Sequence, residues 1–199
     1  MAGVCERLTR LANQLLNLSR AEAGLAGVGE NVRLDLMHVL EEVLARHEPA
    51  AHAKRQTLEL FGDGRPLWLR GNLMMLEEMV ANLVDNAVRY SPPNSRIAVE
   101  ARDSGDDVRL TVRDDGPGLS DFERHRVMDR FYRGAGVTEP GSGLGLAIVR
   151  EIVRAHHGRL ELTPARADGT GLRVLIDLPS YRQRDVGVLN EPATASTPP

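Results

Sequence analysis

Residues 77–92 read EEMVANLVDNAVRYSP, and this stretch decides the expected fold class. Its apolar spacing predicts a helix on which Asn82 and Asn86, four residues apart, share one face. Paired amides on a helix whose other side is apolar need a polar partner, and their oxygens suit Mg²⁺ that keeps part of its water shell. Arg89 and Tyr90 end the helix, where they could contact a phosphate and a base. The same pattern by itself would also fit ordinary asparagines on a helix surface.

The sequence around this helix predicts one domain of mixed secondary structure, from residue 34 to residue 179. Helical spacing occurs at 36–44, 73–90 and 144–155, and strand patterns occur at 57–60, 67–69, 97–101, 108–112, 160–162 and 172–178. The turn signal at 103–106 joins two of these strands into an antiparallel hairpin. We therefore expect an α+β two-layer sandwich, with a mixed sheet of about five strands under three helices.

An acidic pair and two glycines follow the strand at 108–112, in the order Asp114-Asp115-Gly116-Pro117-Gly118-Leu119. This composition predicts a turn, and solvent-exposed aspartates in a plain turn are one interpretation. The other is a nucleotide pocket. There the Asp114 carboxylate would accept a hydrogen bond from the amino group of adenine, and the glycines would let the backbone approach the ring.

The segment 139–149, EPGSGLGLAIV, is rich in glycine and opens a helix. Free N–H groups at a helix start favour phosphate oxygens, so the segment predicts anion binding; a glycine-rich loop with a structural role alone is the other interpretation. The segment is not a Walker loop, because no lysine followed by serine or threonine comes after the glycines, and not a dinucleotide fingerprint, because no strand precedes it. Residues 133–142 contain few apolar residues, and we expect a lid that orders over nucleotide.

Just before that loop, residues 128–133 read MDRFYR, an aromatic pair flanked by arginines. Aromatic residues beside a mobile loop usually pack the loop down. Alternatively, the segment is a docking or phosphate-sensing element.

The composition favours a soluble globular protein. The chain has 199 residues, 42% of them apolar, and a formal net charge of −3, which excludes a disordered polyelectrolyte and gives no broad positive field for nucleic acid. Cys5 is the only cysteine, which favours a reducing compartment, and the start lacks the apolar core of a signal peptide. We expect a cytoplasmic location. The chain has 24 arginines and one lysine, Lys54, a bias that we attribute to a GC-rich genome rather than to phosphate binding.

Taken together, four segments occur in an order and spacing that resembles sensor histidine kinases. NLVDNAVRYSP, DDGPGL, DRFYRG and GSGLGLAIV are similar to the asparagine box, first glycine box, phenylalanine box and second glycine box of that family. The resemblance covers about residues 4 to 179, because RLTRLANQLLNLSRAEAG also resembles the second helix of the family's dimerisation hairpin. It implies the Bergerat fold of the GHKL superfamily, shared with gyrase, Hsp90 and MutL, with ATP and Mg²⁺ held beneath a lid.

The resemblance also implies roles for individual residues. Asn86 matches the asparagine that binds Mg²⁺, Asn82 its helper one turn earlier, and Asp114 the aspartate that reads adenine. The remaining nucleotide-binding positions that it implies are Arg89, Tyr90, Gly116, Gly118, Leu119, Arg130, Phe131, Arg133, Gly141, Ser142, Gly143, Leu144, Gly145 and Leu146. ATPases of the superfamily carry a glutamate at the position of Asn82, and an amide cannot act as a general base, so we expect slow intrinsic hydrolysis.

The departures from the family concern the phospho-accepting histidine. None of the six histidines lies in the family's acceptor box: His47-Glu48-Pro49 is the nearest imitation, and His156 is expected to be structural. Leu172 also stands where many members have threonine. We therefore expect a catalytic half that does not autophosphorylate alone. It would transfer the γ-phosphate to a histidine-bearing helix of the same, membrane-anchored parent kinase or of a split-kinase subunit, for relay to a response regulator.

Apolar residues at spacings of three and four between Val4 and Leu18 predict an amphipathic helix within residues 1–27. Such a helix is marginal alone, so it would fold back on its own domain or join a four-helix bundle in a homodimeric kinase. Residues 180–199 are expected to be a disordered tail. Two alternative functions stay open: a nucleotide-dependent docking module, and an anti-sigma-type serine kinase, which shares the nucleotide fold. The N-terminal helix, Asn82 and DRFYRG argue against the serine kinase.

Overall fold

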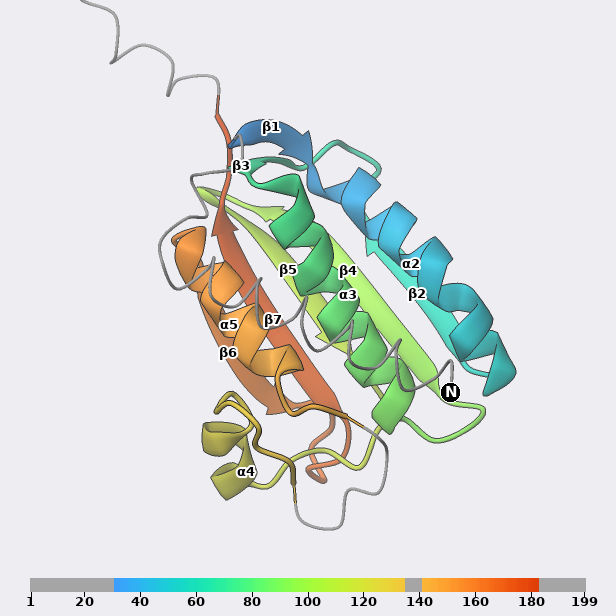
Figure 1. Ribbon diagram of the computed structural model, residues 1–199. Coiled ribbons are helices and arrows are strands. Elements are labelled where there is room, and N and C mark those ends of the chain that lie inside the picture. The colour runs from blue at the N-terminus through green and yellow to red at the C-terminus, as the bar shows by residue number, and fades with distance from the viewer. Residues whose placement is uncertain (1–30, 135–140, 183–199) are drawn as a thin grey trace, which may run out of the picture.

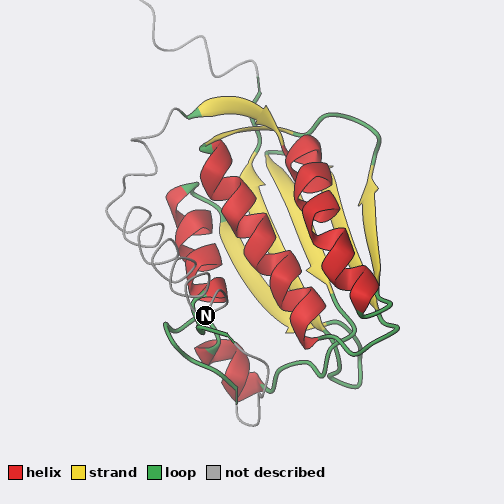
Figure 2. Ribbon diagram, turned by 45° about the vertical axis from the view of Figure 1, so that its right-hand side comes forward, coloured by secondary structure: helices red, strands yellow, loops and turns green. Residues whose placement is uncertain are grey.

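The computed structural model describes residues 31–134 and 141–182. Three helices lie on one face of a five-stranded sheet (Figure 1), and the view turned by 45° shows the same two layers (Figure 2). The helices are α2 (Leu36–Ala53), α3 (Leu73–Tyr90) and α5 (Gly145–Ala155). The strands, in their order across the sheet, are β2 (Thr57–Gly62), β4 (Arg96–Ser104), β5 (Asp107–Arg113), β7 (Leu172–Pro179) and β6 (Arg159–Pro164). The predicted two-layer sandwich is confirmed.

The sheet is mixed, as expected. β2 and β4 run parallel, with α3 in the connection between them, whereas β4–β5, β5–β7 and β7–β6 are antiparallel. The β4–β5 hairpin closes through Gly105, whose φ of +81° suits glycine and whose N–H donates to Asp103 Oδ1 at 2.9 Å. The predicted hairpin is therefore present.

The core lies between the helices and the sheet. Alternate strand residues point toward the helices and are fully buried, as at Ile97, Val99, Leu110 and Ile176. The opposite face of the sheet carries charged residues joined across strands. One of these ion pairs joins Arg109 Nε to Asp177 Oδ1 at 2.7 Å. One face of the sheet is thus packed and the other polar.

Two elements were absent from the sequence-based expectation. β1 (Val32–Asp35) pairs with β3 (Trp68–Gly71) in a separate two-stranded sheet, so the strand predicted at 67–69 does not join the main sheet. α4 (Asp121–Arg126) begins with a capping box of Ser120 and Glu123 and buries no residue. A helix without a buried face leaves no apolar periodicity in the sequence, which explains why it was missed.

The predicted helix within residues 1–27 and all but the first three residues of the predicted tail lie outside the described residues. Ser180 and Tyr181 still belong to the fold: Ser180 bridges to Leu69, and Tyr181 N–H donates to the Trp68 carbonyl at 2.8 Å. In the described part of the chain, no helix is both long and apolar enough to cross a membrane.

His156 links the end of α5 to the start of α3. Its Nδ1 lies 2.8 Å from the Ile152 carbonyl oxygen, and its Nε2 accepts the N–H of Asn72, the N-cap residue of α3, at 3.2 Å. A Cβ on Gly71 would lie only 2.7 Å from the imidazole, so glycine is needed for this approach. Burial lowers the pKa of His156, an effect opposed by the hydrogen bond to Ile152 and reinforced by nearby His157. The imidazole is therefore structural and neutral.

We expect His156 to make the fold less stable in mild acid. Because its pKa in the folded state lies below the ordinary value of 6.5, its contribution is complete above that pH and is lost as the pH falls toward the folded-state pKa. The check is the free energy of unfolding in urea between pH 7.5 and 5 for the native chain and for His156→Gln, which keeps an acceptor without titrating. The pH dependence should flatten in His156→Gln and stay unchanged in His125→Gln, on exposed α4; equal slopes in all three would contradict the assignment.

Candidate functional site

The residues singled out in the sequence meet at one end of the sandwich. They come from the C-terminal half of α3, the loop after β5 and the N-terminal end of α5. Glycines set the spacing between these segments. A Cβ on Gly145 would lie 3.2 Å from both Asn82 Oδ1 and Asn86 Nδ2, and one on Gly116 would lie 3.3 Å from the Tyr90 carbonyl oxygen. The close approach depends on the absence of side chains at these positions.

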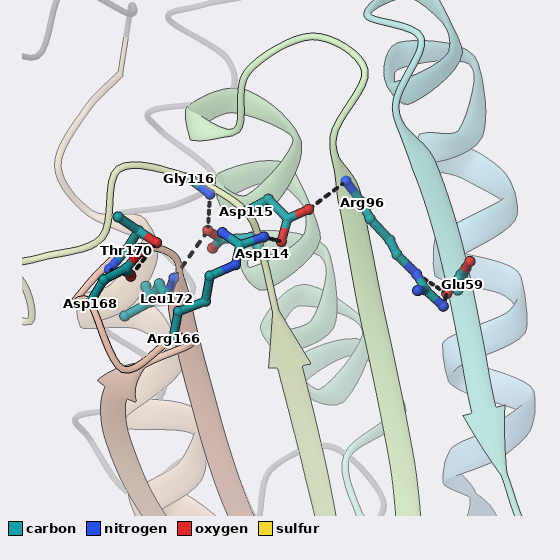
Figure 3. A network of polar contacts seen from close by, with 9 residues as sticks. All are labelled: Glu59, Arg96, Asp114, Asp115, Gly116, Arg166, Asp168, Thr170 and Leu172. Atoms are coloured by element: carbon teal, nitrogen blue, oxygen red, sulfur yellow. Dashed lines mark hydrogen bonds and ion pairs between the residues drawn. The ribbon is translucent and has the colours of Figure 1, made fainter.

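Asp114 lies at the end of β5, and its side chain is buried (Figure 3). Its Oδ1 accepts two backbone hydrogen bonds, from Gly116 N–H at 2.8 Å and from Leu172 N–H at 3.2 Å. Among the described residues Oδ2 accepts no hydrogen bond. Burial raises the pKa of the Asp114 carboxyl above its ordinary value, against the lowering effect of the two backbone N–H groups. The site therefore holds one buried carboxylate in a fixed orientation.

The β6–β7 loop is a part of the site that sequence reasoning missed. Gly171 N–H donates to the Gly116 carbonyl at 2.8 Å, and Asp114 N–H donates to the Leu172 carbonyl at 3.0 Å. A Cβ on Gly118 would lie 2.3 Å from the Gly169 carbonyl oxygen, which requires glycine there. The only signal in the sequence was the turn-forming run Asp168-Gly-Thr-Gly171. This loop packs against residues 114–119, which we call the first glycine segment.

Asp115 points away from Asp114 and contacts residues of neighbouring segments. Its Oδ1 accepts from Arg166 Nη2 at 2.7 Å, and its Oδ2 accepts from the Arg96 backbone N–H at 3.1 Å (Figure 3). Neighbouring aspartates therefore have different surroundings. Asp114 faces inward, whereas Asp115 ties the loop to the β6–β7 loop and to the start of β4.

The two asparagines of α3 do share a face, and both face the N-terminal end of α5. Asn82 is buried, and its Nδ2 donates to the Glu78 carbonyl at 2.8 Å and to Glu78 Oε1 at 3.0 Å. Both N–H groups of the amide are thereby used, which leaves Oδ1 directed toward Gly145. Glu78, which sequence reasoning passed over, thus sets the orientation of the Asn82 amide.

Arg89 and Tyr90 lie at the C-terminal end of α3, beside residues 141–149, which we call the second glycine segment. A Cβ on Gly141 would lie 3.1 Å from Arg89 Nη1 and 3.5 Å from Tyr90 Oη. Arg89 also forms an ion pair with Asp85, one turn earlier on the helix. Both side chains are therefore placed where that segment approaches the helix.

The aromatic segment and the second glycine segment are joined directly. Phe131 N–H donates to the Gly143 carbonyl at 3.0 Å, and Gly143 has a φ of +71°, with backbone atoms of Phe131 2.7 Å from where its Cβ would be. Phe131 is 64% exposed, so it does not pack the loop into the core. Residues 135–140, within the predicted lid, lie outside the described residues.

The other predicted positions divide between the surface and the core. Arg130 and Arg133 are exposed, Leu119 and Ser142 are half-buried, and Leu144 and Leu146 are buried. Leu144 N–H donates to Ser142 Oγ at 3.3 Å, next to the start of α5. The two leucines therefore anchor the glycine segment through the core.

The polar groups at the site are side-chain amides, backbone N–H groups and one carboxylate. Within residues 31–134 and 141–182, no three His, Cys, Asp or Glu side chains are grouped to hold a metal ion. Mg²⁺ needs no such group, because it commonly takes one or two protein oxygens together with substrate phosphates and water. The oxygen donors around Gly145 fit that requirement. Two hollows of about 370 and 440 Å³ lie elsewhere, both bordered by His157.

The sequence matches the family model described as histidine kinase-, DNA gyrase B- and HSP90-like ATPase over residues 71–182. The sensor protein SphS of Synechococcus elongatus is 36% identical over 203 residues, covering 87% of this chain and 49% of SphS. The histidine-protein kinase/phosphatase MprB of Mycobacterium ulcerans is 33% identical, covering 98% of this chain and 37% of MprB. This chain thus spans no more than about half of either relative.

Solved structures show the same fold. A mycobacterial sensor histidine kinase MprB aligns with a TM-score of 0.66 at 33% identity, over 75% of this chain and 97% of that one. Full-length ShkA in complex with AMPPNP aligns with a TM-score of 0.75 at 25% identity, over 87% of this chain and 36% of that one. The similarity extends over most of the chain in both cases.

Proposed function

This chain belongs to the histidine kinase-, DNA gyrase B- and HSP90-like ATPase family and contains the ATPase domain of a sensor histidine kinase, from which we propose that it binds ATP with Mg²⁺ and transfers the γ-phosphate to a histidine outside this chain. The observation that supports this most strongly is the buried Asp114, whose Oδ1 is held by two backbone N–H groups while Oδ2 is left for a ligand. Such a carboxylate can accept a hydrogen bond from the amino group of adenine, which guanine lacks at that position.

The other residues fit the rest of ATP. Backbone N–H groups at the start of α5 and in the glycine segment before it would donate hydrogen bonds to phosphate oxygens. Arg89, Arg130 and Arg133 would add positive charge. Tyr90 would border the adenine, and Phe131 would stand on the lid side. The complex of ShkA with AMPPNP shows that a protein of this fold binds an ATP analogue.

Asn86 would hold Mg²⁺ through its amide oxygen, and Asn82 would support it, with its amide oriented by Glu78. The ion, when bound, would compensate the charge of the phosphates. Because the Asn82 side chain is an amide, it cannot deprotonate water, and we expect ATP to remain intact until an imidazole attacks. The acceptor would be a histidine-bearing helix of a homodimeric parent kinase, with a response regulator as the next recipient.

Replacing Asn86 by alanine should remove the Mg²⁺ dependence of nucleotide binding. We expect the affinity for a non-hydrolysable ATP analogue to fall about tenfold or more with Mg²⁺ present, the scale of one lost bond to a charged partner, and to change little in EDTA. Titration calorimetry on the 199-residue chain in both conditions is the measurement. An equal loss with and without Mg²⁺ would show that Asn86 acts on the nucleotide or on the fold and not through the ion.

Transfer itself requires an acceptor. With γ-labelled ATP, the chain should transfer the label to a supplied dimerisation hairpin that carries the family's histidine. Without the hairpin, the chain itself should acquire no label. Tight binding of ATP without transfer to any cognate hairpin would favour a nucleotide-responsive docking module, and label on serine would favour a serine kinase. A folded chain that binds no adenine nucleotide would exclude all three activities.

A further inference from the structure

The single lysine of the chain contacts the C-terminal end of α3, the helix that carries Asn82 and Asn86. Lys54 follows the last residue of α2, and its ammonium group reaches the C-terminal end of α3. Its Nζ donates to the carbonyl oxygens of Val88 at 2.8 Å, Arg89 at 2.7 Å and Ser91 at 3.4 Å. Three carbonyl groups thus converge on one nitrogen atom.

This geometry explains why a lysine stands here in a chain that otherwise uses arginine. The sequence contains 24 arginines and one lysine. An ammonium group carries three donors on one atom and can direct them at three oxygens around a point. A guanidinium group spreads its donors over a planar fork, which suits two parallel acceptors and not a convergent set. Lys54 is therefore not interchangeable with the arginine that the composition of this chain favours.

Gln56 completes the contact from the same connection between α2 and β2. Its Nε2 lies within hydrogen-bond distance of the carbonyl oxygens of Val88 at 3.1 Å, Ser91 at 2.9 Å and Pro92 at 3.2 Å. The last carbonyl groups of a helix have no partners within the helix and carry partial negative charge, so a cation there is favourable. Together Lys54 and Gln56 hold the backbone from Val88 to Pro92.

The held backbone contains the last turn of α3 and the first residues after it, next to the candidate nucleotide site. Arg89 and Tyr90 lie within it, and their side chains border Gly141 on the other side. The Tyr90 carbonyl oxygen also lies 3.3 Å from where a Cβ on Gly116 would be. A small displacement of this turn would therefore move both side chains and change the spacing between Tyr90 and Gly116.

We propose that Lys54 is a positioning residue for nucleotide binding: it fixes the last turn of α3 from behind, so that Arg89 and Tyr90 keep the geometry that receives ATP. The inference rests on the proposed function. Lys54 would act through the backbone of α3, without contacting the nucleotide itself. Its ammonium group also offsets the negative end of the α3 dipole, next to a site that must accept a polyanion.

The single lysine allows a direct spectroscopic test on the native chain. Selective ¹⁵N-lysine labelling yields one side-chain ammonium signal. We expect its protons to exchange slowly, because all three are hydrogen-bonded, and the signal to shift when a non-hydrolysable ATP analogue binds. An ammonium signal that exchanges as fast as free lysine, or that does not respond to the nucleotide, would overturn the inference.

Variants test the effect on binding. Lys54→Met should weaken the affinity for the analogue about tenfold. Lys54→Arg should weaken it nearly as much, because a planar guanidinium group cannot direct its N–H groups at three convergent oxygens. Trp68→Ala is the control, since it removes the contact of Trp68 with Arg33, whose guanidinium carbon is 3.8 Å from the ring centroid. These residues belong to β3 and β1, which lie near the other end of α3 (Figure 1). Trp68→Ala should lower the unfolding midpoint without changing affinity.

The outcomes separate this inference from the proposed function. If the native chain binds the analogue and folded Lys54→Met or Lys54→Arg binds within about twofold of it, only the role of Lys54 is wrong. If Lys54→Met does not fold, the affinity of Lys54→Arg and the ammonium signal of the native chain decide whether Lys54 positions the site. If the folded native chain binds no analogue, the proposed function fails and this inference fails with it.

Discussion

Asparagine at position 114 is expected to weaken ATP binding by about ten- to a hundredfold, because one charged hydrogen bond contributes about 1.5–3 kcal/mol. Oδ1 already accepts the N–H groups of Gly116 and Leu172, so the amide of Asp114→Asn will place its oxygen there. The NH₂ group then replaces Oδ2 and directs a donor at the amino group of adenine. Affinity for GTP should fall less, since that donor can approach the guanine carbonyl oxygen.

The same substitution should leave the fold intact. Because burial raises the pKa of the Asp114 carboxyl, the ionised form is disfavoured in the folded chain, and a neutral amide should be at least as stable at neutral pH. Calorimetric titration with ATP and GTP analogues, combined with urea unfolding, measures both effects. Asp115→Asn is the matched control: its carboxylate contacts Arg166 and the Arg96 backbone, and its loss should change affinity less than about threefold. Equal effects at the two positions would show that Asp114 does not read the base.

Alanine at position 171 should destabilise the chain by about 3–4 kcal/mol, which places it among the largest effects of a single substitution. Gly171 has a φ of +68°, and a Cβ would lie 2.4 Å from the Asp114 carbonyl oxygen. That contact involves backbone, which cannot move without breaking the hydrogen bonds between this loop and the first glycine segment. Any folded population should also bind ATP poorly, because Asp114 would be displaced.

Gly169→Ala provides the control within the same loop. Gly169 has a φ of +88° but no atom within 4 Å of the Cβ position, so only the backbone conformation is penalised, by about 1–2 kcal/mol. Urea unfolding of both variants separates steric overlap from backbone strain. If the two variants lose the same stability, the close packing of Gly171 against Asp114 does not limit the loop.

Much of the fold was predictable because its elements bury one face each. The helix at 73–90 and the strands at 97–101, 108–112 and 172–178 leave apolar residues at regular spacings, and all four appear in the structure near those bounds. β1 and α4 were missed. β1 has one buried residue and α4 has none, so neither imposes such a pattern on the sequence.

The candidate site was predictable in part, for a different reason. Asn82, Asn86, Asp114 and the glycines stood out because their chemistry is unusual for the elements that carry them, and the structure brings them together. Glu78 and Gly171 did not stand out, and Lys54 stood out only as the single lysine of the chain. A charged residue on a helix, a lysine at a helix end and a glycine in a turn are ordinary in sequence, and only their partners make them notable. The nucleotide contacts themselves remain predictions.

What the sequence determined by itself is the fold class, the order of the motifs and the kind of chemistry expected, since these depend on periodicity and residue type along the chain. Tertiary structure alone decided which oxygen of Asp114 is held by backbone N–H groups, which way the Asn82 amide points and which carbonyl groups meet Lys54. These properties arise from contacts between segments more than 30 residues apart, or from the rotamer of one side chain. The physical reason is that local pattern specifies which face of an element is buried, whereas hydrogen-bond partners are specified only once the buried faces have packed.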